Sequence, residues 1–292
     1  GALVSPWAWT IESRQDGTPE ANRIHVHDAS GEPPLSWKID EQRWVRTCVP
    51  YQIEEMRAAW PGPLAAMDWV HYDVNATGHG TPCFRTDHAL HGNRPVGHRE
   101  TVAFTRALLG AETNGNRIVS SEGFNPSYAA HYDIGSVKAL PQWGRQRWTT
   151  VPLTMLVYHD CLVHDWWEVH GYTRLPSFAA LTSSGDDGPS RGCGQGALKA
   201  AMDALYGCPP NVFPFGRQYY WVGNTWEKTA SFTLRFDDAA VQESLAHALP
   251  VARLHARTGR EELVGFRFLS DDFAVQETAF ANGIRVVANF AA

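Results

Sequence analysis

Two acidic residues each follow an apolar run and precede a loop. Asp73 ends the run Met67-Asp-Trp-Val-His-Tyr-Asp73, and Glu122 ends the run Arg117-Ile-Val-Ser-Ser-Glu122. A pair of carboxyl groups can cleave a glycosidic bond, because one attacks or stabilises the anomeric carbon while the other protonates the leaving oxygen. The alternative role for each acid is a helix cap or a salt bridge. Since both end successive apolar runs, we predict that Asp73 and Glu122 form a catalytic pair.

Polar and aromatic residues near these and other run ends are candidates for sugar contacts. The run that ends in Tyr158-His159-Asp160 offers a histidine and an aspartate that suit either sugar hydroxyls or a structural hydrogen bond. The chain has twelve tryptophans, and doublets such as Trp166-Trp167 are hard to bury whole, which favours a sugar-binding cleft over a core for some of them. The predicted substrate-binding residues are Tyr72, Asn75, His159, Asp160, Trp166, Trp167, Trp9 and His27.

A metal-dependent hydrolase is the alternative enzyme, and it rests on Arg23-Ile-His25-Val-His27-Asp28. A His-x-His pair on a strand directs both imidazoles to one face, as in metal-dependent amidohydrolases. Thirteen histidines make such a spacing easy to find by chance, and no later histidine and aspartate complete the set. We therefore predict no metal ligand and no redox cofactor, with a calcium ion at the turn Ser184-Gly-Asp186-Asp187-Gly as a weaker alternative.

The cysteines indicate no known motif. The five include no CxxC pair, so neither a zinc ribbon nor a thioredoxin motif is supported, and their odd number leaves at least one unpaired. The segment Asp87-His88-Ala-Leu-His91 is interpreted as loop residues without an assigned role.

The elements that must position these residues alternate between strand and helix. Short apolar strands that alternate with helices predict a parallel sheet covered on its faces. An open nucleotide-binding sheet is disfavoured because neither GxGxxG nor GxxxxGK[ST] occurs. The expected strands are residues 3–11, 23–27, 65–74, 117–121, 153–158 and 211–215, and the expected helices are residues 53–60, 99–109, 195–206 and 237–257.

We therefore predict an α/β fold of the (β/α)8 TIM-barrel type over residues 1–257, incomplete at its N-terminus. The carboxyl ends of the barrel strands would form the mouth that holds the acids. Residues 263–269, 274–280 and 284–290 look like strands around the turn Ala281-Asn282-Gly283, and Asn-Gly between apolar runs is a strong hairpin signal. Residues 258–292 are the predicted beginning of a C-terminal antiparallel β domain.

The charge and the hydropathy of the chain indicate which classes of partner to expect. The net charge is -6 and the lysines and arginines are scattered, so no basic face for nucleic acid is expected. The longest apolar stretches are far shorter than the roughly 20 residues of a membrane-spanning helix. The expected partner is an oligosaccharide or glycoconjugate.

The first residues resemble the interior of a strand rather than a signal peptide, which suggests a fragment or a processed chain. The oligomeric state stays open.

Three motifs resemble a known family. At Tyr72-Asp73-Val, Ser120-Ser121-Glu122-Gly123 and the run that ends in His159-Asp160-Cys161, the chain resembles bacterial glycoside hydrolases related to the endo-α-N-acetylgalactosaminidase and α-N-acetylgalactosaminidase families, numbers 101 and 129. The closing residues 275–290 resemble the strand pair that opens the β domain after their barrel, and the resemblance runs from about residue 66 to 290.

The resemblance implies a retaining mechanism. Carried over, Asp73 attacks the anomeric carbon, and Glu122 protonates the leaving group and then activates water. The leading hypothesis is a retaining α-glycosidase that acts on a glycan with galactose or N-acetylgalactosamine, outside the cytoplasm because such substrates lie there. The metal-dependent hydrolase and a carbohydrate-binding protein without turnover remain the alternatives.

Overall fold

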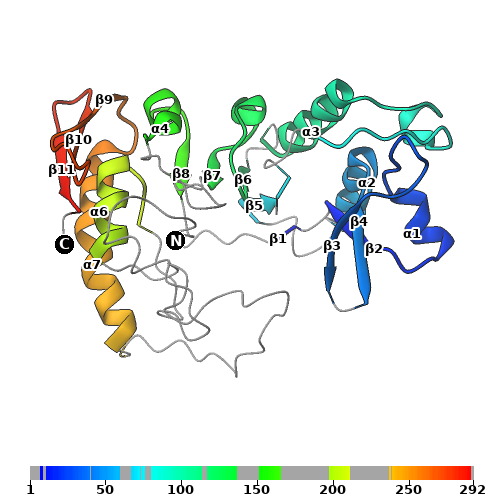
Figure 1. Ribbon diagram of the computed structural model, residues 1–292, viewed down its shortest axis with the longest axis horizontal. Helices are drawn as coiled ribbons and strands as arrows, with labels where there is room; N and C mark the ends of the chain where they lie inside the picture. Colours follow the sequence, from blue (N-terminus) through cyan, green and yellow to red (C-terminus); the bar gives the residue numbers. More distant parts are fainter. Residues whose placement is uncertain are drawn as a thin grey trace. The chain divides into compact units, whose positions relative to one another are not determined.

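The computed structural model describes residues 7–8, 11–39, 41–59, 67–72, 74–75, 80–113, 117–136, 151–165, 197–210, 237 and 239–290. These residues fall into two compact units, the first up to Gly135 and the second from Ser136 onward. Each unit has a hydrophobic core of its own. Figure 1 shows the helices and strands of both units.

The first unit contains the predicted parallel sheet. Its strands hydrogen-bond in the order β1-β5-β6-β7, all in parallel. Val70 and Val119 at its centre have no exposed surface, so the β-branched side chains of the apolar runs are covered. The bounds are β1 (Trp7–Ala8), β5 (Trp69–Tyr72), β6 (Ile118–Ser121) and β7 (Ile134–Ser136). The parallel sheet of the α/β prediction is thus confirmed, and closure into a barrel stays a prediction.

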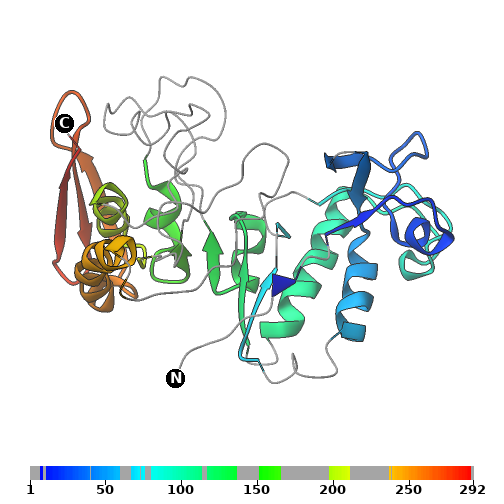
Figure 2. The ribbon, with the colours of Figure 1, turned by 90° about the horizontal axis from the view of Figure 1, so that it is seen from below.

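Two predicted helices pack against each other, and one of them contacts this sheet. Helix α3 (His98–Thr113) contacts both β6 and helix α2 (Val49–Ala59), and Figure 2 shows α2 and α3 side by side. The buried residues Thr101, Thr105 and Leu108 of α3 recur every three or four positions, which places them on one face of the helix. A 3-10 helix, η3 (Pro126–His131), also contacts α3.

A second, antiparallel sheet of the first unit has the order β2-β4-β3. Its strands are β2 (Glu12–Arg14), β4 (Gln42–Arg46) and β3 (Leu35–Ile39). The strand predicted over residues 23–27 is wrong, because helix α1 (Pro19–Ile24) ends inside that segment and only His25 forms an isolated β-bridge, with Thr47. Thr18 caps α1 by accepting the Ala21 N–H, and a proline at the first helical position favours a helix start.

The second unit contains the predicted C-terminal strands. They form an antiparallel sheet in the order β11-β10-β9, and helix α6 packs against β10, β11 and helix α7. All three strand predictions are confirmed, while a domain boundary at residue 258 stays a prediction. The bounds are α4 (Leu153–Tyr158), β8 (Val163–Asp165), α6 (Ala197–Tyr206), α7 (Ala239–Thr258), β9 (Leu263–Phe268), β10 (Val275–Phe280) and β11 (Arg285–Asn289).

The strand predicted over residues 153–158 is wrong, since this segment is helix α4. Leu153 and Val157 are exposed, whereas Met155 and His159 are buried. Residues four positions apart thus have the same exposure, as expected for a helix with one buried face. A short apolar run does not by itself distinguish a buried strand from a short helix. His159 and Asp160 therefore follow a helix and do not end a strand.

Within the described residues, no helix combines the length and the apolar character needed to cross a membrane. Residues 211–215, one of the predicted strands, lie outside the described part of the chain.

Candidate active site at the ends of β5 and β6

Glu122 directly follows β6 and is half-buried. Its N–H donates to the Tyr72 carbonyl at 3.3 Å, and Tyr72 is the last residue of β5. Asp73 is next in the sequence and lies outside the described residues. The hydrogen bond therefore joins the backbone of one predicted catalytic acid to the residue that precedes the other.

Three polar side chains meet on one face of the sheet, just before these strand ends. Ser120 Oγ accepts from Trp69 Nε1 at 2.7 Å and lies 2.8 Å from His71 Nδ1. Trp69 and His71 share a face because side chains alternate along a strand. The cluster connects β5 to β6 through side chains as well as through the backbone.

The opposite face is closed. The side chains of Val70, Tyr72 and Val119 have no exposed surface. The ring of Tyr72, which was predicted to contact the sugar, is thus fully buried. Sugar binding by Tyr72 stays a prediction.

Asn75 lies two residues beyond Asp73 and is buried. Its Nδ2 donates to Gln52 Oε1 at 2.8 Å, and Gln52 Nε2 donates to the Thr47 carbonyl at 2.8 Å. Both side chains line a cavity of about 100 Å³ in the first unit, together with Thr101 and other residues. Small-molecule sites are usually about 300–1,000 Å³, so this cavity is smaller than such a site. In the described structure, Asn75 fastens the chain after β5 to helix α2.

The two histidines of the metal hypothesis are placed differently from each other. His25 is fully buried, and its Nε2 lies 2.9 Å from Ser13 Oγ. Burial lowers the pKa of His25 to about 4, with a smaller contribution from His27. Burial also lowers the pKa of His27. Among the described residues, neither histidine joins a group of three or more potential metal ligands.

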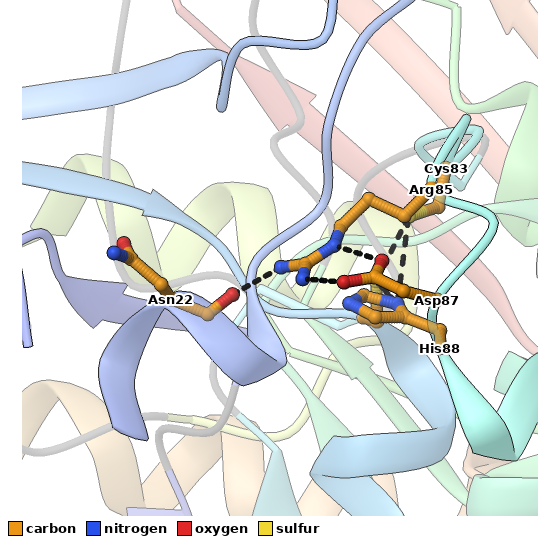
Figure 3. A network of polar contacts seen from close by, with 6 residues as sticks. Asn22, Cys83, Arg85, Asp87 and His88 are labelled. Carbon is orange, nitrogen blue, oxygen red and sulfur yellow. Dashed lines mark hydrogen bonds and ion pairs between the residues drawn. The ribbon is translucent and has the colours of Figure 1, made fainter. Parts of the chain in front are cut away.

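Four residues without a predicted role come together elsewhere in the first unit. The ligand atoms of Cys48, Cys83, His88 and His91 all lie within 4.8 Å of one another, and all four residues are buried. We call them the Cys/His cluster. Figure 3 shows Cys83 and His88 facing each other within it. The spacing Cys83-x4-His88-x2-His91 is a sequence signal for this cluster, but its fourth member is 35 residues before Cys83.

His159 and Asp160 belong to the second unit. The two ring nitrogens of His159 lie 2.6 Å from the Glu261 carbonyl oxygen and 2.9 Å from the Gly207 carbonyl oxygen. Asp160 is exposed and accepts from the Cys161 thiol at 3.3 Å. His159 therefore connects three backbone segments of its own unit, and sugar binding by either residue stays a prediction. The remaining predicted contacts, Trp9, Trp166 and Trp167, and the calcium turn with Asp186 and Asp187 lie outside the described residues.

Comparisons with known proteins identify the fold. No family model matches the chain, and no curated protein matches its sequence. The solved structure of the α-N-acetylgalactosaminidase NagBb from Bifidobacterium bifidum, in complex with GalNAc, matches with a TM-score of 0.67 and 19% identity, covering 99% of this chain and 41% of that one. The chain shares the fold of this enzyme. The resemblance to α-N-acetylgalactosaminidases that the sequence motifs indicated is therefore confirmed at the level of the fold.

A second glycosidase is more distantly similar. The maltogenic α-amylase AmyB from Thermotoga neapolitana matches with a TM-score of 0.51 and 13% identity, covering 99% of this chain and 64% of that one. Ligand-free NagBb gives a TM-score of 0.66 at 19% identity, covering 99% of this chain and 40% of that one. The chain thus spans about two fifths of the length of NagBb.

Proposed function

We propose that the chain carries the catalytic carboxyl pair of a retaining α-glycosidase, with Asp73 as nucleophile and Glu122 as acid/base. The register of β5 and β6 carries the proposal: Tyr72 pairs with Ser121, and the Glu122 N–H donates to the Tyr72 carbonyl. In parallel strands, the residues that follow a registered pair are neighbours as well. The register therefore supports Asp73 next to Glu122.

The alternation of side chains supports the same pair. His71 and Ser120 contact each other across one face of the sheet, and Asp73 and Glu122 are each two residues further along their strands. A strand that continues regularly presents every second residue to the same face. Neighbouring strands lie about 4.8 Å apart, close to the roughly 5–5.5 Å that separates the carboxyl groups of retaining enzymes. Inverting enzymes need about 6.5–9.5 Å, so the strand spacing favours retention.

The barrel and the substrate are parts of the same proposal. Parallel strands in the order β1-β5-β6-β7 and a fold shared with two glycosidases support a (β/α)-barrel whose mouth holds the two acids. The name and the GalNAc complex of NagBb support an α-linked galactose or N-acetylgalactosamine residue on an oligosaccharide or glycoconjugate. We propose that this substrate is met outside the cytoplasm.

Activity of matched variants tests the pair. We expect the chain to cleave an aryl α-N-acetylgalactosaminide or α-galactoside, and Glu122→Gln to lower kcat about 10²–10⁴-fold, the usual contribution of general acid–base catalysis. Asp68→Asn is the control, because Asp68 is exposed at the amino end of β5, where barrel residues serve stability. Equal activity of wild type and Glu122→Gln would refute the assignment.

The stereochemistry of the first product tests retention separately. NMR during early turnover should show the α-anomer before mutarotation, and azide should restore turnover of an activated aryl glycoside by a Glu122→Ala variant. The β-anomer as first product would replace retention by inversion. Binding of the sugar with no turnover by the wild-type chain would favour the carbohydrate-binding alternative.

A further inference from the structure

We propose that the Cys/His cluster is a structural zinc site, with Cys48, Cys83, His88 and His91 as its four ligands. Two sulfurs and two imidazole nitrogens form a ligand set that zinc prefers in tetrahedral structural sites, whereas calcium and magnesium require oxygen ligands. The cluster lies apart from Glu122 in the sequence and has no part in the proposed hydrolysis.

The distances between the ligand atoms agree with tetrahedral zinc. Bonds of about 2.3 Å to sulfur and about 2.0–2.1 Å to nitrogen place two bound sulfurs about 3.8 Å apart, and a sulfur and a nitrogen about 3.5 Å apart. Cys48 Sγ and Cys83 Sγ are separated by 3.2 Å, and His88 Nδ1 lies 3.3 and 3.7 Å from them. Small shifts of these side chains therefore accommodate the ion.

Burial argues for a structural rather than a catalytic site. Cys48 and Cys83 are each 2% exposed, His88 is 1% exposed and His91 is 5% exposed. A catalytic zinc site keeps one position open for water or substrate, whereas here four protein ligands enclose the position.

Local structure brings the two histidines together. They are three residues apart around the 3-10 helix η2 (Ala89–His91), with His88 as its N-cap. Side chains at positions i and i+3 of a 3-10 helix eclipse one another, and the two imidazole centroids lie 4.9 Å apart. Gly92 ends the helix with a φ of 68°, a left-handed conformation that favours glycine.

The ligands come from two separate parts of the sequence, Cys48 just before α2 and the loop that holds Cys83, His88 and His91. Cys48 directly precedes α2, and its N–H donates to the Ile24 carbonyl at 2.9 Å. Cys83 is held by an isolated antiparallel bridge to Val96. Apart from this bridge and η2, residues 80–97 have no regular secondary structure, so a metal ion would supply the cross-link that a hydrogen-bonded sheet supplies elsewhere.

A salt bridge borders the cluster on its exposed side. Figure 3 shows Arg85 directed toward Asp87 and toward the carbonyl of Asn22, with Cys83 and His88 next to them. The guanidinium therefore fastens the ligand segment to helix α1.

Metal analysis of the purified 292-residue chain tests the proposal. After expression in zinc-supplemented medium and exhaustive dialysis, we expect about one zinc ion per chain by mass spectrometry of the metal, the stoichiometry of a single four-ligand site. Replacement by Co²⁺ should give sulfur-to-cobalt charge-transfer absorption and the intense visible bands of tetrahedral cobalt. Absence of bound zinc together with absence of these bands would overturn the proposal.

Matched variants locate the ion. Cys83→Ser and His88→Ala should lose the zinc and the cobalt bands, whereas Cys161→Ser should keep both, since Cys161 is exposed and outside the cluster. Should Cys83→Ser not fold, the cobalt spectrum of the wild-type chain still decides. A chain without metal in which intact-mass analysis finds a Cys48–Cys83 disulfide would also overturn the site, since the two sulfurs would then be consumed.

Discussion

Replacing Gly207 by alanine should lower the free energy of unfolding. Gly207 directly follows helix α6 with a φ of +72°, and a Cβ added there would lie 2.1 Å from His159 Nε2. The same imidazole contacts the carbonyl oxygens of Gly207 and Glu261. Gly207→Ala therefore strains the backbone and also displaces the buried ring that connects three segments of the second unit.

The magnitude follows from three contributions. A left-handed conformation costs a residue with a Cβ about 1 kcal/mol more than glycine. Forcing the His159 ring aside overpacks a buried region, which costs about 1–3 kcal/mol. The hydrogen bond that the ring donates to a backbone carbonyl is weakened, at about 0.5–1.5 kcal/mol. We expect Gly207→Ala to lower the free energy of unfolding by about 3–5 kcal/mol, measured by urea denaturation.

Gly283 supplies the matched control. It has a φ of +85° in the turn between β10 and β11, yet nothing lies within 4 Å of its added Cβ. Gly283→Ala should therefore cost only the backbone strain, about 1 kcal/mol. In a double-mutant cycle, the effects of Gly207→Ala and His159→Ala should be strongly non-additive, because the clash needs both side chains. Equal destabilisation by Gly207→Ala and Gly283→Ala, or additive effects in the cycle, would refute the reasoning.

Three further predictions concern buried polar groups. Because the pKa of His25 is held at about 4 against 6.5 in the unfolded chain, the stabilisation is fully present above pH 6.5 and should fall by up to about 3 kcal/mol toward pH 4. Urea denaturation at several pH values should show this fall in the free energy of unfolding, and His25→Gln should reduce the pH dependence. Asn75→Ala removes the donor to Gln52 Oε1 and should destabilise by about 1–3 kcal/mol in urea denaturation, whereas an unchanged stability with a raised KM would indicate a sugar contact instead. Thr278→Val removes the buried 2.7 Å bond to the Leu205 carbonyl and should cost about 1 kcal/mol, measured as a lower thermal midpoint, while an unchanged midpoint would contradict that role.

Strands β5 and β6 were predictable from the sequence because Val70 and Val119, which have no exposed surface, belong to short apolar runs. A short apolar run bounded by a loop is consistent with a buried strand, and an acidic residue before the loop then marks its end. Glu122 illustrates this, since it directly follows Ser121, the last residue of β6. The C-terminal hairpin was also predictable, because Asn282-Gly283 specifies a turn between two apolar runs.

The strands predicted over residues 153–158 and 23–27 were wrong for a different reason. In both segments a short apolar run was interpreted without the signals at its start, which are Pro152 before α4 and the Thr18 cap with Pro19 before α1. Such runs fit a strand and a short helix equally well until capping residues are considered. His159 was therefore placed at a strand end, although it follows helix α4.

The Cys/His cluster was missed because its ligands converge only through tertiary structure, yet it bears on the candidate active site. Cys48, whose sulfur lies 3.2 Å from that of Cys83, directly precedes helix α2, and Gln52, whose side chain accepts from Asn75, lies near the start of that helix. Gln52 also donates its N–H to the Cys48 carbonyl. The chain that leaves β5 after Tyr72 is thus fastened near the start of helix α2 at Asn75 and again at Cys83. A cross-link there would hold Cys83 to the same part of the chain that Gln52 holds to Asn75, so the proposed zinc site and the Asn75 contact would stabilise the start of α2 together.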